Sequence, residues 1–130
     1  MSRRTGADLK RENTFLSSFR HAADGVRAAW HERNFRIDVA AALLALALCA
    51  VLRVPAWGWV AVVVCIGVQI ALETINTAIE SVVDLASPDI HPLAARAKDC
   101  AAGAALITAC SSVVVAAIVY GSAVIGLVSA

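Results

Sequence analysis

The chain has 130 residues, of which 60% are hydrophobic and only 16% are charged. Soluble domains average about 45–50% apolar and about 25% charged residues, so this composition indicates a membrane protein with a single domain. The formal net charge of +1 provides no basic field of the kind that binds nucleic acid.

The N-terminal segment is polar at first and then amphipathic. Residues 1–13 carry charges without periodicity, which predicts a flexible cytoplasmic tail before one membrane domain over 14–130. From 15 to about 31, apolar residues recur at helical spacing between basic residues, which predicts an amphipathic helix on the membrane surface. The alternative is a helix packed on another protein surface. The large apolar residues are Phe15, Leu16, Phe19, Val26 and Trp30.

Three apolar segments follow, and each is long enough to cross a bilayer. We expect transmembrane helices at about 35–54, 57–86 and 92–122, with Pro55 and Gly58 marking the first turn. Ser87 and Pro88 break the second helix, and Pro92 suits the first turn of the third. The predicted fold class is an all-α membrane protein with one surface helix and three transmembrane helices.

The distribution of charge predicts the orientation of these helices. Most Lys and Arg residues lie at or before Arg36, and segments rich in Arg stay in the cytoplasm. The first apolar run begins about 38 residues into the chain, too late for a secretory signal, so we expect a retained anchor. The prediction is a multi-pass protein of the bacterial cytoplasmic (inner) membrane, with a cytoplasmic N-terminus and an external C-terminus.

Counting along the helices places the charged residues in depth. A hydrocarbon core of about 30 Å corresponds to about 20 helical residues. Counted from the turns, Glu32, Glu80, Lys98 and Asp99 fall near the cytoplasmic face, and Glu73 lies about two helical turns inside it.

One stripe of the second transmembrane segment is polar. At about 100° per residue, one face carries Gln69, Glu73, Asn76, Thr77, Glu80 and Asp84. An acidic residue at mid-membrane costs about 2.5–3.5 kcal/mol, and such residues usually mark function. A polar stripe that joins helices through hydrogen bonds is the structural alternative. Three carboxylates on one face weaken that alternative, because like charges repel unless a cation or a proton intervenes.

The turn before the third helix supplies a cation at the same depth. Lys98 is either a side chain that anchors the helix end at the interface or a group that holds a phosphate chain. Mg²⁺ in proteins typically takes one or two carboxylates plus substrate phosphates, and phosphoryl transfer needs little beyond a positioned base. The scattered Cys and His residues suggest no other metal site, and no glycine-rich phosphate loop is present. The residues therefore predict a magnesium–phosphate site without defining the reaction.

Four motifs in order resemble the family of small prokaryotic membrane kinases that act on diacylglycerol and undecaprenol. They are Glu-Arg-Asn-Phe at 32–35, Glu-Thr-Ile-Asn-Thr-Ala-Ile-Glu at 73–80, Val-Asp-Leu at 83–85 and His-Pro-Leu-Ala-Ala-Arg-Ala-Lys-Asp at 91–99. The similarity covers roughly residues 15–120. It implies a homotrimeric lipid kinase whose ATP-dependent active sites lie where the membrane meets the cytoplasm. The stretch from Gly25 to Glu32 is one residue shorter than the family pattern, so no nucleotide contact is carried over from it.

The resemblance also implies a role for each matched residue. Glu73 would bind the lipid hydroxyl and act as its general base, and Glu32 and Glu80 would bind Mg²⁺. The same resemblance gives a nucleotide-binding set made of Glu32, Asn76, Glu80, Lys98 and Asp99. The motif forms favour undecaprenol as the acceptor, with diacylglycerol as the alternative.

Two functions of other classes would also place carboxylates in a helix bundle. The first is a proton- or cation-conducting oligomer, and the second is a structural membrane subunit. A conducting oligomer needs a polar path through the whole bilayer, whereas the outer halves of all three segments are apolar.

Overall fold

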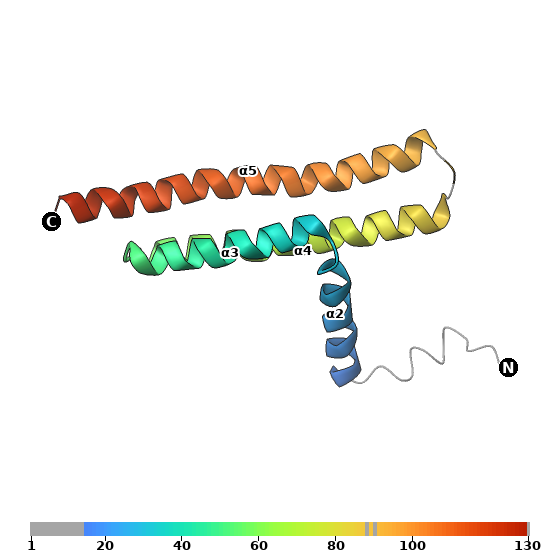
Figure 1. Ribbon diagram of the computed structural model, residues 1–130, viewed down its shortest axis with the longest axis horizontal. Helices are drawn as coiled ribbons and strands as arrows, with labels where there is room; N and C mark the ends of the chain where they lie inside the picture. The colour runs from blue at the N-terminus through green and yellow to red at the C-terminus, as the bar shows by residue number, and fades with distance from the viewer. Residues whose placement is uncertain (1–14, 88, 90, 130) are drawn as a thin grey trace.

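The computed structural model describes residues 15–87, 89 and 91–129, and within them the chain forms four α-helices. These are α2 (Phe15–Ala29), α3 (Arg33–Val51), α4 (Ala56–Ala86) and α5 (Pro92–Val128). Figure 1 shows α3, α4 and α5 running along one common direction, with α2 leaving the bundle steeply near the start of α3. Helix α4 is central, because it packs extensively on α5 and on α3, whereas α3 and α5 touch little.

Helices α3, α4 and α5 are each long and apolar enough to cross a membrane. The prediction of an all-α protein with three membrane spans is therefore confirmed. The boundaries differ slightly: α3 occupies 33–51 rather than 35–54, and α5 continues to Val128 rather than ending at 122. The extension has a simple reason, because the chain after Cys100 contains no proline and no charged residue to end the helix. The predicted tail over 1–13 lies outside the described residues.

The three spans differ in length, and α4 and α5 are much longer than α3. Helix α3 has 19 residues, α4 has 31 and α5 has 37. At about 1.5 Å per residue, α3 is about 28 Å long and just matches a bilayer core, whereas α4 and α5 reach about 46 and 55 Å. The end of α4 and the start of α5 extend past the level at which α2 leaves the bundle (Figure 1). This α4–α5 hairpin therefore rises beyond the apolar layer that α3 defines.

Two caps fix the ends of the helices. At the end of α3, the backbone N–H of Val54 donates to Cys49 (3.0 Å) and that of Arg53 donates to Ala50 (3.3 Å). This is a Schellman pattern, and Arg53 takes the left-handed position (φ 52°) that glycine usually fills. At the start of α5, His91 Nδ1 accepts from the N–H of Leu93 (3.2 Å), and Pro92 is the first helical residue, as predicted.

The outer end of the bundle holds the main apolar core. It consists of Cys49, Val54, Val62, Val119 and Ala123, drawn from α3, α4, α5 and the turn before α4. The hydroxyl of Tyr120 donates to the backbone carbonyl of Ala45 at 2.9 Å, which joins α5 to α3 across this core. Gly58 lies at the closest approach of α4 to the α3–α4 turn and α5, because an added Cβ would lie 2.9 Å from Val119 Cγ1 and closer still to Val54 Cγ1.

We predict that Gly58→Ala destabilises the bundle. The new methyl group would force two β-branched side chains with restricted rotamers to move, and such overpacking typically costs about 1–3 kcal/mol. Thermal unfolding in detergent micelles measures the effect. Gly67→Ala in the same helix is the control, because nothing lies within 4 Å of its added Cβ. Equal stability of the two variants would contradict the packing described for Gly58.

Candidate active site at the membrane surface

Glu73 and Asn76 are the buried polar side chains of α4, with only 4% and 6% of their surface exposed. They lie where the chain bends from α2 into α3, and α2 contacts α4 in this region. Ala29 and Phe35, on either side of the bend, are buried as well, and the rings of Trp30 and Phe35 meet edge to face at 6.2 Å. The bend from 29 to 35 is called the elbow below.

The electrostatic neighbours of Glu73 are other carboxylates, namely Asp38, Glu80 and Glu32. They come from three places: Glu32 caps the start of α3, Asp38 lies inside α3, and Glu80 lies two turns beyond Glu73 on α4. Glu73 thus has one acidic neighbour on its own helix and two from the region where α3 begins. Repulsion among carboxylates that act on one another favours a bound cation or proton.

Asn76 connects Glu73 to Glu80 along the same face of α4. Its Nδ2 donates to Glu80 Oε1 at 3.2 Å. Its Oδ1 is buried and accepts no hydrogen bond from the described residues. A buried acceptor without a partner is costly, so this oxygen is available to a ligand hydrogen or to a metal ion.

The oxygens of this site suit Mg²⁺. Among the described residues, no group of three or more His, Cys, Asp and Glu side chains is arranged to hold a metal ion. Mg²⁺ does not need such a cage, because it usually binds one or two carboxylates and completes its shell with water and phosphate oxygens. Glu80, with the unpaired oxygen of Asn76 beside it, and Glu32 in the elbow offer oxygens of that kind.

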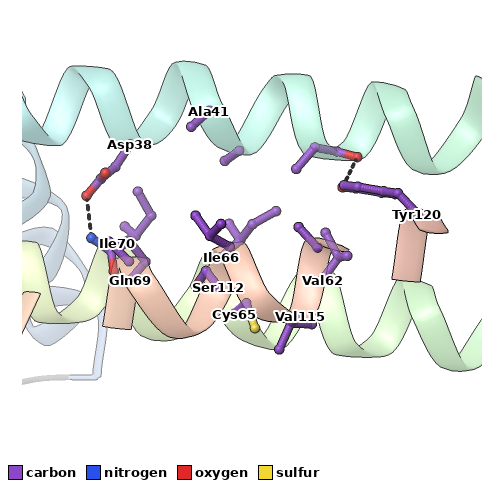
Figure 2. Close-up of a pocket in the computed structure, with 15 residues that line it drawn as sticks. Asp38, Ala41, Val62, Cys65, Ile66, Gln69, Ile70, Ser112, Val115 and Tyr120 are labelled. Carbon is purple, nitrogen blue, oxygen red and sulfur yellow. Dashed lines mark hydrogen bonds between the residues drawn. The ribbon is translucent and has the colours of Figure 1, made fainter. Parts of the chain in front are cut away.

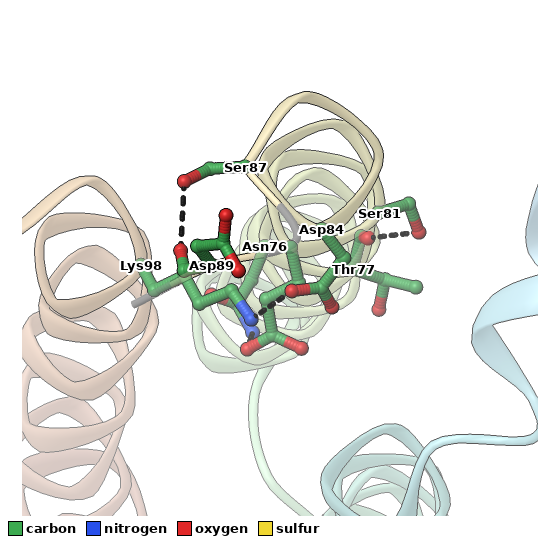
Figure 3. Close-up of polar contacts among 8 residues, drawn as sticks. Asn76, Thr77, Ser81, Asp84, Ser87, Asp89 and Lys98 are labelled. Carbon is green, nitrogen blue, oxygen red and sulfur yellow. Dashed lines mark hydrogen bonds and ion pairs between the residues drawn. The ribbon is translucent and has the colours of Figure 1, made fainter. Parts of the chain in front are cut away.

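Lys98 lies farther out than this cluster. Its ammonium group pairs with the Asp84 carboxylate at 2.5 Å, which ties the start of α5 to the end of α4. Figure 3 shows Lys98 reaching across from α5 to α4. Both side chains are accessible, with 38% and 67% of their surface exposed. Asp99 is exposed on α5. The structure thus brings Glu32, Glu73, Asn76 and Glu80 into one neighbourhood, with the Lys98–Asp84 pair one turn beyond.

Sequence reasoning missed Asp38. Its Oδ2 accepts a hydrogen bond from Gln69 Nε2 at 2.9 Å, and its charge acts on Glu73. A signal was present, because Asp38 falls inside the first predicted span, and an acidic residue within a span is by itself a candidate for function.

These features define a multi-pass helical membrane protein with a carboxylate site at one surface of the bilayer. The sequence profile described as prokaryotic diacylglycerol kinase matches residues 20–120. The chain therefore belongs to the prokaryotic diacylglycerol kinase family and is a lipid kinase of that family.

The similar proteins carry two enzyme names. The undecaprenol kinase of Bacillus subtilis (strain 168) is 38% identical over 109 residues, covering 83% of this chain and 89% of that protein. The diacylglycerol kinase of Synechocystis sp. is 40% identical over 102 residues, covering 77% of this chain and 58% of that protein. The diacylglycerol kinase of Escherichia coli (strain K12) is 39% identical over 84 residues, covering 64% and 69% respectively.

The exposure of the Lys98–Asp84 pair leads to a prediction about stability. Exposed ion pairs contribute about 0–1 kcal/mol, so Asp84→Asn should change the free energy of unfolding by no more than about that amount. Thermal unfolding in detergent, beside Asp89→Asn as an exposed control, measures it. A loss of several kcal/mol would show that the pair holds the α4–α5 hairpin together.

Proposed function

We propose that this protein transfers the γ-phosphoryl group of Mg-ATP to the hydroxyl of a membrane lipid alcohol, with undecaprenol as the acceptor and undecaprenyl phosphate as the product. The observation that carries the proposal is the buried Glu73, which lies among three other carboxylates where the elbow crosses α4. A structural carboxylate does not need three acidic neighbours. A site that binds Mg²⁺ gains from nearby carboxylates, because the cation offsets their mutual repulsion.

Each residue of the site has its own role in this proposed reaction. Glu80 and Glu32 would hold Mg²⁺, whose charge neutralises the phosphate oxygens and orients them. Asn76 and Asp99 support the nucleotide side of the site. Lys98, now paired with Asp84, is a flexible cation close enough to the acidic cluster to exchange that carboxylate for a phosphate.

Glu73 is placed to act on the acceptor. It lies about two turns deeper than Glu80 on α4, at a depth that a lipid hydroxyl reaches from the membrane. The hydroxyl oxygen attacks the γ-phosphorus, its proton passes to the Glu73 carboxylate, and ADP leaves. The deep base and the shallow metal ligands match a reaction between one substrate in lipid and one in water.

Diacylglycerol is the second candidate acceptor, because two of the similar proteins are named diacylglycerol kinases. Undecaprenol is favoured because the relative named undecaprenol kinase matches most of both chains. A direct assay distinguishes undecaprenol from diacylglycerol as the acceptor. Purified protein in mixed micelles receives labelled ATP, Mg²⁺ and either lipid, and labelled lipid product is counted. We expect a higher kcat/KM with undecaprenol; preference for diacylglycerol supports the second candidate, and no product with either lipid overturns the proposal.

The family resemblance extends the proposal to a homotrimer in the bacterial inner membrane. Large apolar side chains are exposed on all three spans of the single chain, for example Leu43, Val63 and Ile107. Such surface suits contact with lipid and with further copies of the chain. The Arg-rich N-terminal half favours a cytoplasmic N-terminus and active site, with the C-terminus outside.

We predict this orientation from labelling of single cysteines in a background without the four native ones. A cysteine at position 57, in the turn after the first span, should react with a membrane-impermeant reagent from outside the cell. A cysteine at position 89, in the α4–α5 turn, should react only after the membrane is opened. The reverse pattern would refute the orientation.

The metal assignment leads to a second prediction. Glu80→Gln and Glu32→Gln should raise the Mg²⁺ concentration needed for activity and lower the maximal rate, because glutamine keeps the shape but removes the negative charge. Titration of activity with Mg²⁺ measures both effects, and Asp89→Asn serves as an exposed acidic control. An unchanged Mg²⁺ dependence in both glutamine variants would contradict the assignment.

The sharpest prediction concerns Glu73→Gln. This change should abolish phosphoryl transfer but leave nucleotide binding nearly intact, since loss of a general base typically costs about 10²–10⁴-fold in rate. Membrane insertion should be unharmed, because a neutral amide is less costly in lipid than a carboxylate. One purified sample serves for oligomer content, binding of an ATP analogue and lipid phosphorylation. If Glu73 only joins helices, assembly is lost and residual activity follows the remaining oligomer.

A further inference from the structure

One side-chain hydrogen bond joins α3 to α4 beside the candidate active site. Gln69 Nε2, on α4, donates to Asp38 Oδ2, on α3, at 2.9 Å, and both side chains are half-buried. Within the part of the chain that the structure describes, it is the only hydrogen bond between a side chain of α3 and a side chain of α4. Gln69 belongs to the polar stripe of α4, yet the proposed reaction gives it no role.

The bond lies at one end of a half-open cavity of about 270 Å³ between α3, α4 and α5. Figure 2 shows the Asp38–Gln69 bond at one end of this cavity and the bond of Tyr120 at the other. Between the two bonds α3 contributes only small side chains to the lining, among them Ala41 and Ala45. Side chains that do not meet cannot fix the alignment of two helices, so over this stretch the bonds at the ends have to do so.

The close packing at the outer end is far from Glu73. Gly58 marks that packing, and Glu73 lies about 22 Å from it along α4. A small change in the angle between α3 and α4 at the outer end would therefore become a large displacement at Glu73. Gln69 is only one helical turn from Glu73, about 6 Å along the axis. Its bond to Asp38 thus restrains the two helices close to the reacting group.

The bond also fixes the carboxylates of α3 against α4. Asp38 acts on Glu73 more strongly than Glu80 or Glu32 does. Glu32 is the residue at which α3 starts, so it moves together with Asp38. The buried Phe35 lies between these two acids, but an apolar contact is non-directional, whereas a hydrogen bond requires a defined distance and angle.

Stability alone does not explain Gln69. Its Oε1 atom is buried and accepts no hydrogen bond from the described residues. A buried acceptor without a partner is destabilising, and replacing both members of a polar pair by apolar groups of similar shape can be neutral or stabilising. Leucine at both positions would leave no such atom. The polar pair is therefore better explained by the alignment that it imposes.

We propose that Gln69 is a positioning residue for phosphoryl transfer, which holds Asp38 and thereby keeps Glu73 on α4 aligned with Glu32 on α3. This inference rests on the proposed function, because it concerns the same reaction. The base and the metal ligand have to act on one phosphoryl group, so their relative position affects the rate of transfer. Displacement of a reacting group by about 1 Å can cost about 10²-fold in rate. Binding of ATP alone does not depend on that alignment to the same extent.

A double-mutant cycle tests this role. Gln69→Glu places a second carboxylate against Asp38 and breaks the bond by repulsion. Asp38→Asn/Gln69→Glu restores an amide–carboxylate pair with the partners exchanged, and Asp38→Asn completes the cycle. The constants are measured in mixed micelles with the better of the two lipid acceptors. We expect Gln69→Glu to lower kcat about 10- to 100-fold with an unchanged KM for ATP, and the double variant to recover most of that loss.

Independent effects of the two substitutions, so that their losses of kcat multiply in the double variant, would overturn the proposal. Thr74→Val is the matched control on α4, because its hydroxyl donates to the Ile70 carbonyl of the same helix at 2.8 Å. This control should retain the kcat of the unaltered protein. A loss in Thr74→Val equal to that in Gln69→Glu would also contradict a specific role of Gln69.

An apolar pair covers the case in which Gln69→Glu does not fold. Asp38→Leu/Gln69→Leu removes the bond together with both polar side chains, so the assembled protein should be as stable as before. We expect its kcat to fall about 10- to 100-fold while thermal unfolding in detergent and oligomer content stay unchanged. A kcat equal to that of the unaltered protein, or a kcat loss that only follows the loss of oligomer, would overturn the proposal.

The two proposals fail separately. If the unaltered protein phosphorylates neither lipid, the proposed function is wrong and the role of Gln69 is removed with it. If the unaltered protein phosphorylates lipid and the apolar pair does so equally fast, only the role of Gln69 is removed.

Discussion

A carboxylate on a membrane-spanning helix must be screened from lipid. In this chain Glu73 is only 4% exposed, and Ala29 and Phe35, on either side of the bend between α2 and α3, are buried as well. The same bend brings Glu32 and Asp38 within electrostatic reach of Glu73. The region around this bend therefore combines the buried Glu73 carboxylate with a concentration of negative charge. An α2 that continued straight into α3 would leave the α4 stripe facing lipid, at the cost expected of an unpaired acid there.

Helix length decides which part of the site meets water. Because α3 just matches the bilayer core, the elbow marks its surface, and the longer α4 and α5 carry their polar ends beyond it. The Lys98–Asp84 pair stands in that projecting hairpin and is accessible, whereas Glu73 and Asn76 remain buried below. The site therefore has one part that is accessible from water and another part that is buried.

The sequence predicted those parts of this arrangement that depend on one helix at a time. The three apolar spans, the start of α5 at Pro92, and the shared face of Glu73, Asn76 and Glu80 all follow from composition and helical period. Asp38 and the partner of Lys98 could not be predicted in this way, since their neighbours depend on how α3 and α5 are aligned against α4. That alignment is set by close packing at Gly58 and by the Tyr120–Ala45 hydrogen bond at the far end of the bundle.

Packing at the two ends of the bundle also explains a cavity of about 270 Å³ between α3, α4 and α5 (Figure 2). Tight packing around Gly58 and the hydrogen bond of Tyr120 close one end, and the buried Phe35 lies toward the other. Between them, alanines of α3 and α5 face each other without side chains long enough to fill the space, so α3 and α5 touch little there. Larger residues would give a denser and more stable bundle. The retained space is lined by Asp38 and Gln69, and Glu73 lies one helical turn beyond Gln69 on α4.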